Sequence, residues 1–190
     1  MNLPNWITLA RVPLLFVIGG LFYASFKGAL SLAFVLYVFA GITDWLDGYL
    51  ARKYHQISDL GKLLDALNDK IFIVGVFILL IGKNLIPLWG VFCVLLIMCR
   101  EFLVTGLRIM AAKSGRIMAA ENLGKVKTVL QIVVIGSFLL IEMLKVDCGF
   151  PSNWLCGLTY LNYINFIIVT ILTAYSGTNY LIKYRHLCNF

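Results

Sequence analysis

Residues 28–52 read GALSLAFVLYVFAGITDWLDGYLAR. The first sixteen residues of this run carry no charge, and the remainder contains Asp44, Asp47 and Arg52. An uncharged apolar run approaching about 20 residues is typical of a membrane-spanning helix. Charged side chains at the end of such a span are costly in hydrocarbon unless they are paired or hydrated, so they indicate a functional site.

The rest of the chain has the same apolar character. Its 190 residues are 61% hydrophobic and 13% charged, and the mean hydropathy is +0.91. An ordinary globular domain is about half apolar and about one quarter charged. The composition excludes a disordered protein and argues against a water-soluble enzyme. We therefore expect an all-α integral membrane protein with a single membrane domain over residues 1–190.

Apolar segments recur along the whole chain, and short gaps separate them. Gly28, Pro87, Pro151 and Gly157 punctuate these gaps. Most of the charge-free runs are shorter than a full span of about 20 residues, so most helices must carry charges toward one end. The pattern predicts six transmembrane helices at 5–26, 29–52, 60–82, 86–112, 122–145 and 158–182.

The net charge of +7 comes from 16 Lys and Arg against 9 Asp and Glu. Basic residues that flank spans contact anionic lipid headgroups, so we expect membrane lipids as partners and no nucleic acid. With the amino terminus in the cytoplasm, ten basic residues flank the cytoplasmic ends of the spans and three flank the other ends. By this asymmetry the aspartates after residue 43 face the cytoplasm.

The five cysteines include no C-x-x-C pair, and the chain has two histidines. A zinc or iron–sulfur site is therefore disfavoured. Cys148 and Cys156 fall in one expected extracytoplasmic loop, where they could form a disulfide or remain free.

Two pairs of aspartates lie at helical spacing inside apolar sequence. Asp44 and Asp47 are three residues apart, and Asp65 and Asp69 are four apart on the next expected helix. A short connection makes the two helices antiparallel neighbours, so the four carboxylates can converge. Carboxylates at close range repel one another unless a cation lies between them. Oxygen ligands select hard cations, so we expect one or two Mg²⁺ or Mn²⁺ ions.

Small residues and an arginine accompany the aspartates. Gly48 and Ala51 share the face of Asp44 and Asp47, and Gly61 shares the stripe of the second pair. Small side chains leave room for a bulky ligand close to the backbone, and Arg52 can bind a phosphate through two hydrogen bonds. Together these residues indicate a diphosphate substrate held for displacement at phosphorus.

These residues resemble a family signature, D-x-x-D-G-x-x-A-R-x8-G-x-x-x-D-x-x-x-D, with every spacing kept. The signature is that of the CDP-alcohol phosphotransferases, which are six-helix membrane enzymes and often homodimers. The resemblance implies transfer of a phosphatidyl or similar group from a CDP-linked donor to an alcohol, with release of CMP. It implies that two Mg²⁺ or Mn²⁺ ions are held by Asp44, Asp47, Asp65 and Asp69. It also implies that Asp69 is the general base and that the CDP moiety contacts Asp44, Gly48, Ala51, Arg52, Gly61 and Asp65.

Three further blocks are similar to the branch of the family that uses CDP-diacylglycerol and sn-glycerol 3-phosphate. They are residues 5–11, residues 100–108 and residues 124–128. A glycerol phosphate dianion needs cations. Residues eight apart on a helix lie about 80° apart, and the start of a helix favours phosphate. We expect the acceptor phosphate to be bound by Arg108, Arg100 and Lys125, with help from Lys127 and Arg11.

Other functions remain open on the sequence alone. The same chemistry could use serine, inositol phosphate or phosphatidylglycerol as acceptor, although the cluster of Arg and Lys favours a phosphorylated alcohol. A membrane prenyltransferase also uses aspartate-bound Mg²⁺, but it usually lacks D-G-x-x-A-R. A transporter often shows internal repeats, and none is visible here. The expected location is the bacterial inner membrane, with the active site facing the cytoplasm.

Overall fold

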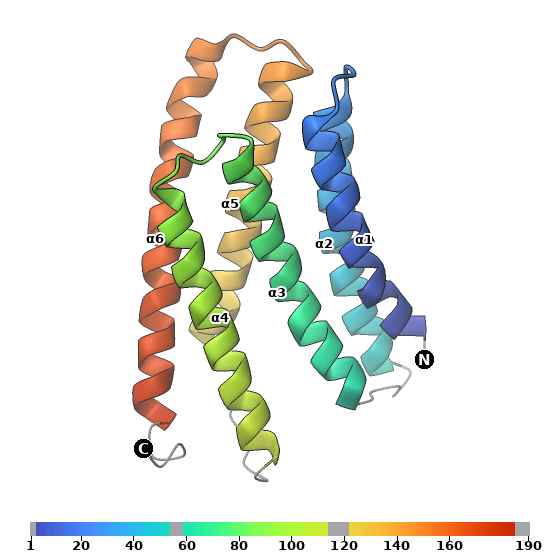
Figure 1. Ribbon diagram of the computed structural model, residues 1–190, viewed down its shortest axis with the longest axis vertical. Coiled ribbons are helices and arrows are strands. Elements are labelled where there is room, and N and C mark those ends of the chain that lie inside the picture. Colours follow the sequence, from blue (N-terminus) through green and yellow to red (C-terminus); the bar gives the residue numbers. More distant parts are fainter. Residues whose placement is uncertain (1–2, 54–58, 114–121, 185–190) are drawn as a thin grey trace.

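The structure is a computed structural model that describes residues 3–53, 59–113 and 122–184. Side chains are described over 10–43, 67–111 and 124–184, apart from residues 125 and 152. The described residues form six α-helices that lie side by side in one bundle (Figure 1). The helices are α1 Leu3–Tyr23, α2 Ala29–Lys53, α3 Asp59–Gly82, α4 Gly90–Lys113, α5 Asn122–Val146 and α6 Ser152–Tyr184.

The six helices expected from the sequence are confirmed, but two of them begin elsewhere. α4 begins at Gly90 instead of residue 86, because a turn precedes it in which Asn84 has a φ of 60° and Gly90 N donates to the Pro87 carbonyl. α6 begins directly after Pro151 instead of at residue 158. Proline suits the start of a helix, where its missing N–H is not needed. The expected gap at Gly157 was therefore wrong, since α6 continues through it.

The bundle contains two sets of helices that meet along its centre. α1 packs on α2 and α3, while α6 packs on α4 and α5. Contacts of α2 with α5 and of α3 with α4 and α5 join the two sets. Phe77, Leu80, Ile135 and Phe166 are fully buried at this junction. α3 thus lies centrally, and side chains near its start can reach both sets.

Close approach of α1 to α3 depends on a missing side chain. A Cβ added at Gly75 would lie 2.4 Å from a methyl carbon of Leu15. Real carbon atoms do not approach so closely, so a larger residue here would push the helices apart. Gly75 thereby permits the tight packing that holds the middle of α1 beside α3.

The outer surface of the bundle is apolar. Phe16, Phe92 and Ile171 expose 75%, 76% and 62% of their surface. In the part of the chain with described side chains, α4, α5 and α6 are long and apolar enough to cross a membrane. Shorter apolar stretches lie in α1 and α2, at Ala10–Tyr23 and Ala29–Thr43. Such exposure is expected of an integral membrane protein, because lipid replaces water around it.

A carboxylate joins the segment after α5 to the start of α2. Asp147, just after α5, accepts hydrogen bonds from the backbone N and the hydroxyl of Ser31, both at 2.7 Å. Its other oxygen accepts from the backbone N of Gly28 at 3.1 Å. These bonds satisfy donors at the start of α2, which have no partner within the helix. The hydroxyl of Ser31 and these backbone donors lower the pKa of Asp147 below its ordinary value.

The cysteines with described side chains are all free thiols, and they include Cys148 and Cys156. Of the two alternatives left open by the sequence for these two cysteines, the structure has the unpaired one, and Cys156 lies within α6 instead of in a loop.

Candidate functional site

Asp69 lies on α3 where two cavities meet. It lines both of them, and Ile73, one turn further along α3, is the other residue that they share. Asp69 is partly exposed. A single carboxylate therefore faces two separate spaces with different walls.

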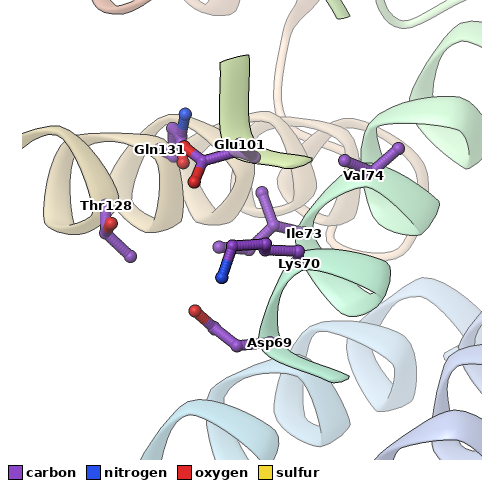
Figure 2. A pocket seen from close by; sticks show the side chains of 7 residues that line it. All are labelled: Asp69, Lys70, Ile73, Val74, Glu101, Thr128 and Gln131. Atoms are coloured by element: carbon purple, nitrogen blue, oxygen red, sulfur yellow. The ribbon is translucent and has the colours of Figure 1, made fainter. Parts of the chain in front are cut away.

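The polar cavity is the space between α3, α4 and α5. Figure 2 shows Asp69 and Glu101 pointing into it from opposite sides, with the amine of Lys70 between them. Thr128 and Gln131 line it from α5. The polar cavity therefore has hydrogen-bond donors and acceptors on three helices. The described residues that line it are Asp69, Lys70, Ile73, Val74, Glu101, Thr128 and Gln131.

The apolar cavity is the space between α1, α2, α3 and α5. Tyr37 and Phe72 form one wall, with their rings stacked at 6.1 Å, and the Tyr37 hydroxyl donates to the Ile132 carbonyl at 2.9 Å. Gly41 leaves an open patch of wall, since a Cβ there would touch nothing within 4 Å. Arg11, which is 3% exposed, brings a positive charge into this largely apolar lining.

The other signature residues lie on the same two helices as Asp69. Asp44 and Asp47 follow Gly41 on α2, within its last turns, and Asp65 precedes Asp69 by four residues on α3. The helical spacing expected from the sequence is thus present. The side chains of Asp44, Asp47, Gly48, Ala51, Arg52, Gly61 and Asp65 lie outside the described residues. Among the side chains that are described, no three His, Cys, Asp or Glu form a metal-binding group.

Neighbouring charges on α4 contact different helices. Arg100 donates to the hydroxyl of Ser176 on α6 at 2.7 Å. Glu101 forms an ion pair with Lys127 on α5 and lies 3.4 Å from Arg100. Consecutive residues on a helix point about 100° apart, which explains why the two side chains reach different neighbours.

Arg108 contacts α6 one turn beyond Arg100's partner. Its Nε donates to the hydroxyl of Tyr180 at 3.1 Å, and its guanidinium lies 5.2 Å from the centre of that ring. Tyr180 is fully buried, so the guanidinium rests on a fixed surface. Arg100 and Arg108 therefore contact the same face of α6, at Ser176 and Tyr180.

The basic residues that were expected to bind the acceptor phosphate lie in several parts of the structure. Arg11 lines the apolar cavity, Lys127 is buried against Glu101, and the two arginines of α4 face α6. The side chain of Lys125 lies outside the described residues. Sequence reasoning assigned no role to Lys70, Glu101, Thr128 or Gln131, although Glu101 and Thr128 lie in two of the similar blocks. A charged glutamate inside an apolar span was the available signal for Glu101.

Comparison with known proteins adds a family match. The family model described as CDP-alcohol phosphatidyltransferase matches residues 1–176. A Rickettsia felis protein named CDP-diacylglycerol–glycerol-3-phosphate 3-phosphatidyltransferase is 38% identical over 181 residues, 92% of each chain. A Bacillus subtilis protein of the same name is 40% identical over 151 residues, 73% of this chain and 77% of its own. A Sodalis glossinidius protein of that name is 30% identical over 190 residues, 98% and 96% of the two chains.

Proposed function

Because the chain belongs to the CDP-alcohol phosphatidyltransferase family, we propose that it transfers the phosphatidyl group of CDP-diacylglycerol to sn-glycerol 3-phosphate. The products are phosphatidylglycerol phosphate and CMP. The observation that carries this proposal is similarity to relatives of that name over nearly the whole chain. The position of Asp69 between two cavities supports it, because the reaction must bring a lipid and a polar acceptor together.

A divalent cation fits the chemistry of the aspartates on α2 and α3. Their carboxylates offer oxygen atoms, the ligands that Mg²⁺ and Mn²⁺ prefer, and the described residues that line the two cavities include no cysteine or histidine. Asp44, Asp47, Asp65 and Asp69 would hold the metal, which we propose to be two ions. When bound, the metal neutralises charge on the diphosphate and improves CMP as a leaving group.

Asp69 is the proposed general base. A base must lie within hydrogen-bonding reach of the proton that it removes, and Asp69 faces the polar cavity that a water-soluble alcohol would enter. It would accept the proton of the attacking hydroxyl as the new bond to phosphorus forms and the bond to CMP breaks. The proposed contacts of the CDP moiety are Asp44, Gly48, Ala51, Arg52, Gly61 and Asp65.

Basic residues in the second half of α4 and at the start of α5 are proposed to bind the acceptor phosphate. Arg108 uses Nε for Tyr180, so its two terminal nitrogens can meet phosphate as a pair. Arg100 and Lys125 are the other proposed contacts, and Lys125 lies in the first turn of α5, where the helix dipole favours an anion. Arg11 and Lys127 add positive charge nearby. The proposed setting is a homodimer in the bacterial inner membrane, with this site facing the cytoplasm.

The test is a transfer assay with purified protein in detergent. Labelled CDP-diacylglycerol and Mg²⁺ or Mn²⁺ are supplied with glycerol 3-phosphate, serine, inositol phosphate or phosphatidylglycerol, and both lipid product and CMP are measured. We expect product with glycerol 3-phosphate alone, and loss of product after chelation or in Asp69→Asn. Product with another acceptor would move the proposal to that alcohol. Absence of CMP with every alcohol would overturn it.

A further inference from the structure

Glu101 is a buried acid that the proposed chemistry does not use. It is 9% exposed and lies within the membrane-spanning part of α4. Charged residues in spans are costly and mark functional sites. The carboxylate forms part of the wall of the polar cavity, across from Asp69 (Figure 2).

The surroundings of Glu101 hold its carboxylate in place. Lys127 pairs with it from α5, and Arg100 lies 3.4 Å away on its own helix. Lys127 is 2% exposed and is absent from the lining of the polar cavity. The lysine therefore stands behind the carboxylate as a positioning residue, and the carboxylate, not the amine, faces the cavity.

An ionised carboxylate accepts hydrogen bonds and donates none. It repels a phosphate and attracts a hydroxyl. In glycerol 3-phosphate one hydroxyl attacks and would lie at Asp69, whereas the second hydroxyl, on the adjacent carbon, needs its own acceptor. Glu101 is the acidic residue that lines the polar cavity opposite Asp69.

We propose that Glu101 accepts a hydrogen bond from the non-reacting hydroxyl of the acceptor and so selects a vicinal diol phosphate over a simple hydroxyalkyl phosphate. This inference rests on the proposed function and deepens it. It also orients the acceptor, because its diol end would lie beside Asp69, Glu101 and the Lys70 amine that Figure 2 shows between them.

The test compares glycerol 3-phosphate with 3-hydroxypropyl phosphate, which lacks the second hydroxyl. The measured quantity is the ratio of kcat/KM for the two acceptors in one enzyme sample, so that the ratio does not depend on the folded fraction. A hydrogen bond to a charged group predicts a preference of at least about 10-fold for glycerol 3-phosphate in the unaltered enzyme. We expect Glu101→Gln to reduce that preference to about 3-fold or less.

The matched control is Glu142→Gln, at the far end of α5, which should keep the full preference. If Glu101→Gln does not fold, because it leaves Lys127 buried without its carboxylate, Glu101→Gln/Lys127→Gln removes both charges and is measured instead. A preference that survives in the Glu101 variant, or is missing in the unaltered enzyme, overturns the inference and leaves the proposed function standing. Absence of transfer to glycerol 3-phosphate in the unaltered enzyme overturns both.

Discussion

Glu101 of α4 and Lys127 of α5 form an ion pair between helices whose main packing partners lie elsewhere. α4 packs chiefly on α6 and α3, and α5 on α6 and α2. Both side chains are buried. The pair therefore links α4 and α5 behind the wall of the polar cavity instead of reinforcing an extensive helix contact.

Removal of one charge of this pair should destabilise the bundle. Lys127→Met leaves Glu101 buried without its lysine, and we expect a loss of about 3–5 kcal/mol. Glu101→Gln/Lys127→Met should recover most of that loss, because neither member of the pair is left buried without the other. The free energies of unfolding of the unaltered protein, the two single variants and the double variant are measured in detergent and compared as a double-mutant cycle. The pair of Glu142 and Lys145, 4.0 Å apart with an exposed lysine, is the control, since Glu142→Gln should cost at most about 1 kcal/mol. Additive losses at Glu101 and Lys127 would contradict this coupling.

Tyr180 should control how well Arg108 binds the acceptor. Tyr180→Phe keeps the ring under the guanidinium and removes the hydrogen bond from Nε. We expect the KM for glycerol 3-phosphate to rise roughly 3- to 10-fold, with the KM for CDP-diacylglycerol unchanged. Tyr180→Leu removes both contacts and should have a larger effect.

The control for Tyr180 is Tyr175→Phe on the exposed side of α6. It should leave both KM values as they are. An equal rise in both KM values in Tyr180→Phe would indicate general damage to the bundle and would refute the assignment of Arg108 to the acceptor.

Gly177 makes room for Arg100. A Cβ at this position would lie 2.5 Å from Cγ of Arg100. We expect Gly177→Ala to displace the arginine from Ser176 and to raise the KM for glycerol 3-phosphate several-fold, even though alanine favours the helix itself. Gly157→Ala on the same helix meets nothing within 4 Å and should have no such effect. Equal KM values for these two variants would exclude Arg100 from acceptor binding.

The bonds from Ser31 and Gly28 to Asp147 should make a pH-dependent contribution to stability. Because the folded state lowers the pKa of Asp147 below its ordinary value near 3.8, the contribution is present at neutral pH and disappears as the pH falls through the lowered value. Asp147→Asn should lower Tm by a few degrees at pH 7. The difference from the unaltered protein should shrink in strong acid.

Ser31→Ala provides the companion measurement for Asp147. It removes the hydroxyl that contributes most to the lowered pKa, so it should lower Tm at pH 7 in the same direction. Because the two residues share one interaction, the double variant should lose less than the sum of the single losses. A Tm difference that stays constant from pH 7 into strong acid would contradict this account.

The sequence was sufficient for the helices and for the position of Asp69, because both depend on local patterns. Apolar runs defined six helices, and the four-residue step from Asp65 placed Asp69 on one stripe of α3. The start of α6 was wrong because Gly157 was read as a break, although a glycine inside a well-packed helix is tolerated. The local sequence pattern is a poor guide to the residue at which a helix begins.

The partners of the charges on α4 were not predictable from the sequence. Glu101 and Lys127 are 26 residues apart, and their contact depends on how α4 and α5 are placed around α3. Arg100 was expected to bind phosphate, and its hydrogen bond to Ser176 depends on the register of α6. Such contacts come from tertiary packing, which one helix's periodicity does not specify.

Among the described residues, the two cavities that meet at Asp69 share Ile73 besides it. If the proposed lipid donor and the polar acceptor occupy these two spaces, they would contact different walls, one from α1 and α2 and the other from α4, and could be bound together. We therefore expect a sequential order of binding with a ternary complex, not a ping-pong cycle. A displacement of that kind passes the phosphoryl group directly between two substrates, and it would invert the configuration at phosphorus once per turnover.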